Sequence, residues 1–167
     1  MKSTIREPLR RFAVAAALAV GAHAAHAEDI VIALKSNPLV DPEPACVAVQ
    51  IGINLLSEID GTSADRVTLF PTLDGVEIVG ERMLPNEELP NGRMKNYPPH
   101  LDCLTPSGYV PLPVVLANFA AKEGAEIIVC PLCWGARYPG EMPIYGSVGN
   151  ASSIHSLFLD ASKVIDF

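Results

Sequence analysis

Four short runs of apolar residues are spaced along the chain, and each predicts a buried β-strand. The first run, residues 29–34, reads DIVIAL and is ended by Pro38 and the polar residues before it. A continuous run of this length suits a strand that is covered on both faces of a sheet. The other three predicted strands are residues 66–70 (RVTLF), 126–129 (EIIV) and 163–167 (KVIDF).

Between these strands, apolar residues recur every three or four positions, which is the spacing of an amphipathic helix. One helix is predicted to begin near Asp41 and Pro42, with Val47, Ile51 and Leu55 on its buried face. The same spacing predicts two further helices and one short helical segment. The first helix covers residues 112–123, with Leu112, Val115, Leu116 and Phe119 on one face; the second is marked by Ile154, Leu157, Phe158 and Ala161; and the short segment contains Val76, Val79 and Met83.

Strands that alternate with helices predict an α/β fold, in which helices flank a small, mostly parallel sheet. Two stretches, residues 85–111 and 139–150, show no clear periodicity and are expected to be irregular. The first is long for a loop in a compact domain, which is typical of a lid, a binding loop or an interface arm. Because no repeat is visible, we expect residues 28–167 to form a single domain.

The first 27 residues have the features of a secretory signal peptide. An apolar stretch, residues 12–20, is too short to span a membrane, and Ala25-His26-Ala27 fits the cleavage pattern. We therefore expect a mature chain that starts at Glu28, works in the periplasm and has no membrane attachment after cleavage. An uncleaved anchor is the alternative. Basic residues precede the apolar stretch: Lys2, Arg6, Arg10 and Arg11.

The charge of the mature chain argues against nucleic acid and anionic membranes as partners. The chain of 167 residues has 12 basic and 19 acidic side chains. Residues 1–27 contain four basic and one acidic side chain, so the mature part keeps 8 and 18 and has a net charge of about −10. No cluster of Lys or Arg remains in it, which excludes the usual electrostatic footprint of a nucleic-acid-binding protein.

A Cys-x-x-Cys pair, Cys130 and Cys133, directly follows the predicted strand 126–129. Chemistry in a parallel sheet collects at the carboxyl ends of the strands, and a helix that begins just after Cys130 would bring N–H groups that stabilise a thiolate. Cys46 lies near the start of the first helix and Cys103 lies in the long irregular stretch, so three or four cysteines could converge. Since an exported chain enters an oxidising compartment, one or two plain disulfides are the alternative.

Three kinds of chemistry fit such a site. The first is a reactive thiolate at Cys130 that carries a persulfide or forms a mixed disulfide. The second is a redox disulfide between Cys130 and Cys133. The third is a site for Cu(I) or Zn, with Cys103, His100 or Met142 as further ligands. A single Cys-x-x-Cys pair is weak evidence for a metal, so no metal ligand is assigned.

Other side chains near the pair are candidates for binding rather than for covalent chemistry. Trp134 and Tyr138 are expected to pack around the site, and Arg137 could partner a thiolate or an anion. His100 and His155 are single histidines and are expected to be ordinary polar residues. The candidate catalytic residues are thus Cys130 and Cys133, and the candidate substrate-binding residues are Cys46, Cys103, Trp134 and Arg137.

At these residues the chain resembles the DsrE/DsrF-like family, the small sulfur-relay proteins of bacterial sulfur metabolism and tRNA thiolation. The likeness covers most of the mature chain, with residues 85–111 as the main gap. The stretches that carry it are residues 30–34 (IVIAL) with 48–56 (AVQIGINLL), 66–79 (RVTLFPTLDGVEIV), 124–137 (GAEIIVCPLCWGAR) and 150–167.

The resemblance implies a Rossmann-like three-layer sandwich that forms homo-oligomers, often trimers or hexamers. It also implies that Cys130 accepts sulfur as a persulfide from a donor protein and passes it to an acceptor protein, with Cys133 as a resolving or second thiol. No cofactor is expected apart from this covalent sulfur. The relay members are cytoplasmic, whereas this chain has an export signal.

We therefore expect an exported sulfur carrier rather than an enzyme with turnover. A periplasmic thiol–disulfide or soft-metal (Cu or Zn) binding protein that uses the same pair is the alternative. A structural oligomer, in which Cys46 and Cys103 would pair in a disulfide, is a third possibility.

Overall fold

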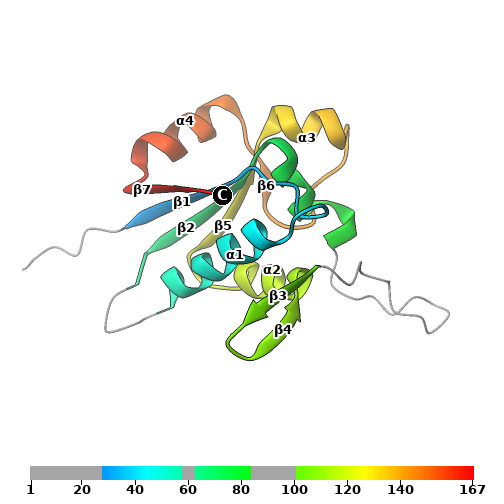
Figure 1. The fold of residues 1–167 in the computed structure, drawn as a ribbon. Coiled ribbons are helices and arrows are strands. Elements are labelled where there is room, and N and C mark those ends of the chain that lie inside the picture. The colour runs from blue at the N-terminus through cyan, green and yellow to red at the C-terminus, as the bar shows by residue number, and fades with distance from the viewer. Residues whose placement is uncertain (1–27, 58–62, 84–100) are drawn as a thin grey trace, which may run out of the picture.

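The computed structural model describes residues 28–57, 63–83 and 101–167, and a parallel sheet forms their centre (Figure 1). The sheet has five strands in the order β6-β5-β2-β1-β7, and every described pairing within it is parallel. Its strands are β1 (Asp29–Leu34), β2 (Arg66–Pro71), β5 (Ala125–Val129), β6 (Ser147–Val148) and β7 (Lys163–Asp166). All four strands predicted from the sequence are present.

Helices cover both faces of the sheet, as the predicted α/β sandwich requires. One face carries α1 (Glu43–Leu56) and α2 (Leu112–Ala120), and the other carries α3 (Pro131–Arg137) and α4 (Ala151–Asp160) (Figure 1). Ile30, Ile32 and Leu34 of β1 belong to the core on the α1 and α2 side. Val31 and Ala33 belong to the smaller core beneath α4. Since alternate residues of a strand point to opposite faces, β1 needs its uninterrupted apolar run.

The buried face of α2 is the predicted one, and that of α1 is the predicted one only in part. Ile51 and Leu55 are half-buried and pack against the core, whereas Val47 is 40% exposed, so its predicted burial is wrong. A Cβ atom at Gly52 would lie 2.8 Å from the ring of Phe119. Small side chains therefore let α1 pack closely against its neighbours, and they displace the larger ones from the buried face. The buried residues of α1 are Ala45, Cys46, Ala48, Val49 and Gly52.

Both stretches that were expected to be irregular contain strands. The hairpin of β3 (Asp102–Thr105) and β4 (Gly108–Pro111) ends the first stretch, whose residues 85–100 lie outside the described part of the chain. Strand β6 lies within the second stretch and pairs with β5. Strands of two to four residues are too short to show an alternating pattern. The predicted short helix around Val76 is present as two 3₁₀ segments, η1 (Leu73–Val79) and η2 (Glu81–Met83).

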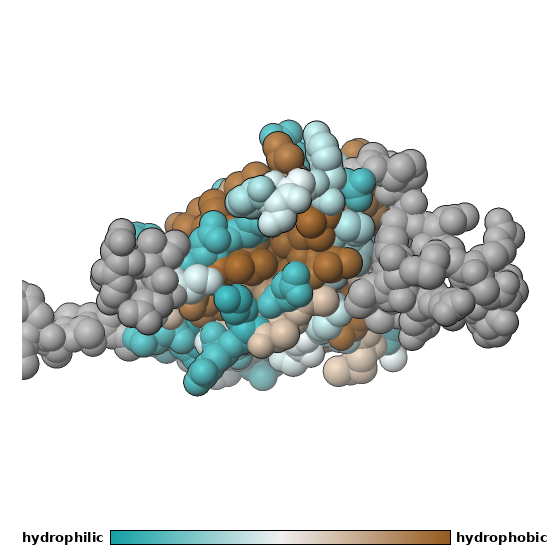
Figure 2. Space-filling model, turned by 90° about the horizontal axis from the view of Figure 1, so that it is seen from below, coloured by the Kyte–Doolittle hydropathy of each residue, from teal (hydrophilic) through white to brown (hydrophobic). Residues whose placement is uncertain are grey.

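The face that carries α1, α2 and the hairpin exposes apolar surface among polar side chains (Figure 2). Val47 of α1 and Leu104 of β3 are among the large apolar residues at the surface, at 40% and 66% exposure. Within the described residues, no helix combines the length and the apolar character needed to cross a membrane. The predicted signal peptide, residues 1–27, lies outside them.

Candidate functional site

Cys130 lies at the carboxyl edge of the sheet, where β5 ends and α3 begins. It is the N-cap residue of α3, as its position in the sequence predicts. Its N–H donates to the carbonyl of Pro71 at the end of β2, at 3.0 Å, and its own carbonyl accepts from the N–H of Trp134, at 2.9 Å. These two bonds fix the start of α3 against the neighbouring strand.

Cys130 and Cys133 face each other across the first turn of α3. Their sulfur atoms are 2.7 Å apart, and both are half-buried free thiols. This separation is longer than the ~2.05 Å of a disulfide bond, and it is shorter than an ordinary contact between two sulfur atoms. The two free thiols therefore need to move little in order to bond.

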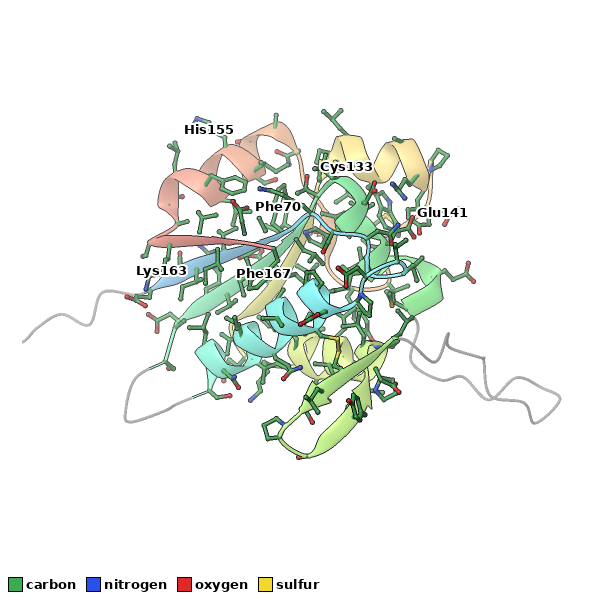
Figure 3. The ribbon with its side chains drawn as sticks, viewed as in Figure 1. Phe70, Cys133, Glu141, His155, Lys163 and Phe167 are labelled. Atoms are coloured by element: carbon green, nitrogen blue, oxygen red, sulfur yellow. A yellow bond between two sulfur atoms is a disulfide. The ribbon has the colours of Figure 1, made fainter. Side chains whose placement is uncertain are left out.

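The turn that follows β2 directs donors at Cys133, on the side of α3 that meets this turn (Figure 3). The N–H of Leu73 donates to the sulfur of Cys133 at 3.1 Å, and the hydroxyl of Thr72 lies 3.5 Å from the same sulfur. Leu73 has a φ of 50°, in the left-handed region, a conformation that costs a non-glycine residue about 1–2 kcal/mol. At Gly75 a Cβ atom would lie 2.1 Å from the carbonyl oxygen of Leu34, so only glycine fits beneath this turn.

The surroundings of Cys133 lower the pKa of its thiol. Partial burial is the largest influence, and it raises the pKa because it disfavours the charged form. The hydrogen bonds from Cys130, Thr72 and the backbone N–H groups of Leu73 and Cys133 favour the thiolate, and together they outweigh burial, so the pKa is lowered. Cys133 is consequently more ionised near neutral pH than an ordinary cysteine.

The structure thus places thiolate-stabilising donors at a different cysteine from the one that the sequence indicates. Helix N–H groups were expected at the sulfur of Cys130, but α3 has only seven residues and the Cys130 side chain makes no capping hydrogen bond. The donors come instead from the end of β2, and they point at Cys133.

Arg137 is bound to two carboxylates, those of Asp74 and Glu77. Its Nη1 donates to Glu77 at 2.7 Å, and its Nη2 donates to Asp74. The hydrogen bond to Glu77 raises the pKa of Arg137, burial opposes this, and the charges of Asp74 and Glu77 add to it. Arg137 is thus held by two carboxylates of the chain itself, and its role as a partner for a thiolate or a bound anion stays a prediction.

Trp134 and Tyr138 pack behind the thiol pair, as predicted. Trp134 is 3% exposed, and its indole N–H donates to the carbonyl of Glu141 at 2.8 Å. The two rings stack with centroids 4.4 Å apart, and the hydroxyl of Tyr138 donates to Glu77 at 2.5 Å. Trp134 therefore holds α3 and the following segment together, and its ring is closed to a substrate.

The expected convergence of three or four cysteines is wrong, because Cys46 and Cys103 form a disulfide. Their sulfurs are 2.04 Å apart, and the bond joins α1 to β3. Both residues are buried, at 5% and 1% exposure. Cys103 lies in the hairpin on the α1 and α2 face, whereas α3 lies on the other face (Figure 1). Neither Cys46 nor Cys103 has a free thiol for a substrate.

Few side chains are available for the soft-metal alternative. In residues 28–57, 63–83 and 101–167, no three His, Cys, Asp or Glu side chains are grouped so that they could hold a metal ion. Met142 is 74% exposed, and His100 lies outside the described part of the chain. His155 is exposed on α4, away from α3 (Figure 3).

Thr72 and Leu73 contact Cys133 but were not among the site residues that the sequence indicates. A signal was present, because Thr72 directly follows β2. The carboxyl ends of adjacent parallel strands meet at one edge of a sheet, so residues after β2 should approach residues after β5. The order of the strands, with β2 beside β5, was needed to use this signal.

Comparisons with known proteins support the fold. Among solved structures, the ychN protein from E. coli matches with a TM-score of 0.58 and 19% identity, over 84% of this chain and 99% of that chain. No protein-family model matches the chain, and no curated protein matches it. At this identity the likeness establishes a shared α/β fold, and the function has to be argued from the site.

Proposed function

We propose that this protein is an exported sulfur carrier of the DsrE type, which holds sulfur as a persulfide on Cys130 and uses Cys133 as a second thiol. The observation that carries the proposal is the half-buried dithiol, with its sulfurs 2.7 Å apart, at the carboxyl edge of a parallel sheet. The fold shared with the ychN protein supports it. So does the likeness of residues 124–137 to the family stretch that ends in the sulfur-bearing cysteine.

Loading of Cys130 is an exchange between a thiolate and a persulfide. The thiolate of Cys133 takes the proton of Cys130 across their 2.7 Å contact, because the thiolate and not the thiol is the nucleophile. Cys130 then attacks the terminal sulfur of a donor R–S–SH. The donor S–S bond breaks, R–S⁻ leaves with the electron pair and takes the proton from Cys133 as R–SH, and Cys130–S–SH is formed beside the Cys133 thiolate.

The remaining features of the proposal concern location and partners. We propose that residues 1–27 direct the chain to the periplasm, that the mature domain is residues 28–167, and that it assembles as a trimer or hexamer. The disulfide between Cys46 and Cys103 supports export, since disulfides persist in oxidising compartments. Sulfur would come from a donor protein and go to an acceptor protein, so the chain acts as a carrier.

Intact mass tests the proposal. Protein purified from the periplasm, fully reduced at the thiol pair and treated with polysulfide, should gain about 32 Da per bound sulfur atom in the Cys133→Ser variant. The adduct should disappear on reduction and should be absent from Cys130→Ser. Ser152→Ala, a change at an exposed position of α4, is the control for handling. A Cys130→Ser protein that loads as well as Cys133→Ser would overturn the assignment of sulfur to Cys130.

Thiol–disulfide exchange is the second candidate, because the same 2.7 Å contact suits disulfide closure. A protein of this kind would exchange with other dithiols and take up no sulfur in either single-cysteine variant. Its wild-type mass would fall by two hydrogens on oxidation. The soft-metal alternative has less support, since the described part of the chain offers the two thiols without a third ligand.

A further inference from the structure

We propose that the protein has an activity beyond carriage: it releases the carried sulfur as hydrogen sulfide by closing the disulfide between Cys130 and Cys133. This inference rests on the proposed persulfide at Cys130. It would make the chain a single-turnover reductant of sulfane sulfur.

The donors of the site act on the cysteine that does not carry the sulfur. Leu73 donates to Cys133 at 3.1 Å and Thr72 lies 3.5 Å from it, whereas the side chain of Cys130 makes no capping hydrogen bond. Leu73 has a left-handed backbone conformation at this contact. Strained residues of this kind persist where the surrounding structure requires them, often at functional sites. A carrier needs one cysteine, so a second one held as a nucleophile indicates a second step.

The geometry brings this nucleophile to the inner sulfur of the persulfide. The sulfurs of Cys133 and Cys130 are 2.7 Å apart on one turn of α3. Thiol–disulfide exchange proceeds by attack of a thiolate on a bonded sulfur. The inner sulfur of a persulfide on Cys130 is such a sulfur, and it lies within bonding reach of Cys133 without a change of fold.

The step balances without an outside reagent in its first turnover. The thiolate of Cys133 attacks the sulfur of Cys130 in Cys130–S–SH, a bond forms between the two cysteine sulfurs, and the bond to the terminal sulfur breaks. The terminal sulfur leaves with the electron pair as HS⁻. The two cysteines have lost two electrons, and the carried sulfur has gained them. A second turnover needs a dithiol reductant, which opens the disulfide by exchange.

Release competes with delivery to an acceptor. Well-oriented groups in one molecule react as if present at about 10⁵ M or more. A free thiol acceptor at millimolar concentration is therefore too dilute to intercept the persulfide before Cys133 does. Transfer of sulfur to a partner would require an acceptor that is docked on the protein, or a Cys133 whose sulfur is already bonded to another group. Cys133 therefore decides between carriage and release.

The experiment measures sulfide and mass on the same samples. Reduced wild type, Cys133→Ser, Cys130→Ser and the control Ser152→Ala are each mixed with one equivalent of glutathione persulfide under argon, and sulfide is measured over time. Wild type and Ser152→Ala should release about one sulfide per chain and lose about 2 Da, the mass of two hydrogens. Cys133→Ser should keep an adduct of about 32 Da and release sulfide at least about 100-fold more slowly. Cys130→Ser should close no disulfide.

The outcomes separate this inference from the proposed function. Wild type that keeps the adduct and releases no sulfide would overturn the inference and leave the carrier intact. Absence of an adduct in Cys133→Ser, together with no sulfide from wild type, would overturn both. Thr72→Val gives a further check, because loss of the hydroxyl near Cys133 should slow sulfide release. An unchanged rate in that variant would contradict the role given to the β2 turn.

Discussion

Replacement of both Cys46 and Cys103 by alanine should remove a large part of the stability of this protein. Their disulfide joins residues 57 positions apart. A closed loop of that length lowers the entropy of the unfolded chain by about 14 cal/mol/K, which stabilises the folded state by about 4 kcal/mol at 25 °C. Folded domains are stable by only about 5–15 kcal/mol. Alanine is the suitable replacement, because both positions are buried and serine would bury a hydroxyl.

Urea unfolding, followed by far-UV circular dichroism, measures this effect. With a denaturant dependence of about 2 kcal/mol per molar urea, the loss corresponds to a fall of about 2 M in the unfolding midpoint. Wild type with all of its thiols reduced should unfold close to the double variant, because reduction removes the same constraint. Ser152→Ala, at an exposed position, is the matched control and should keep the wild-type midpoint.

A midpoint shift below about 0.5 M, equivalent to about 1 kcal/mol, would refute this reasoning. It would mean that the unfolded chain is already compact around Cys46 and Cys103, so that the bond constrains little. Reduction leaves the sulfur atoms in the core, whereas alanine substitution removes them. A large midpoint shift on alanine substitution without one on reduction would therefore assign the effect to core packing.

Three further predictions concern the thiol site. Thr72→Val should raise the pKa of Cys133, because the hydroxyl favours the thiolate. Since the thiolate is lost as pH falls through the pKa, alkylation of Cys133 by iodoacetamide at pH 7 should slow, and the pH profile of alkylation should move to higher pH. An unmoved profile would contradict the role of the hydroxyl. Gly75→Ala would place a Cβ 2.1 Å from a backbone carbonyl of β1, so the melting temperature should fall by an amount equivalent to about 3 kcal/mol, whereas unchanged melting would show that the turn can shift. Arg137→Leu leaves Glu77, whose side chain is 12% exposed, without its cation; it should lower the free energy of unfolding in urea by about 1–2 kcal/mol, and a neutral effect would mean that the tyrosine hydroxyl alone satisfies the carboxylate.

The central strands of the sheet could be predicted from the sequence because they are covered on both faces, whereas the order of the strands could not. Residues 30–34 (IVIAL) have no polar side chain on either face and are all buried, as expected for a strand that is covered on both faces of the sheet. The face of α1 could be predicted only in part, because the rule that large apolar residues are buried fails where a helix packs closely. Gly52 rather than Val47 meets the core there.

The candidate site divides in the same way. The position of Cys130 and Cys133 at a strand end depends on local sequence, so it was predictable. The contacts of Thr72 and Leu73 with Cys133 join residues about 60 positions apart, and they depend on β2 lying beside β5. The pairing of Cys46 with Cys103 was expected only under the structural alternative, because the position of Cys103 depends on β3 and the hairpin was not visible in the pattern.

The position of the disulfide also bears on how the protein matures. On the proposed export route the amino-terminal part of the chain emerges first, so Cys46 is followed by Cys103 and only later by Cys130 and Cys133. The bond between Cys46 and Cys103 joins the first two cysteines to arrive, and the last two remain as neighbours in the dithiol. Oxidation in order of appearance therefore produces the native pairing. Such a chain can mature with a simple oxidant and has little need of an isomerase to correct it.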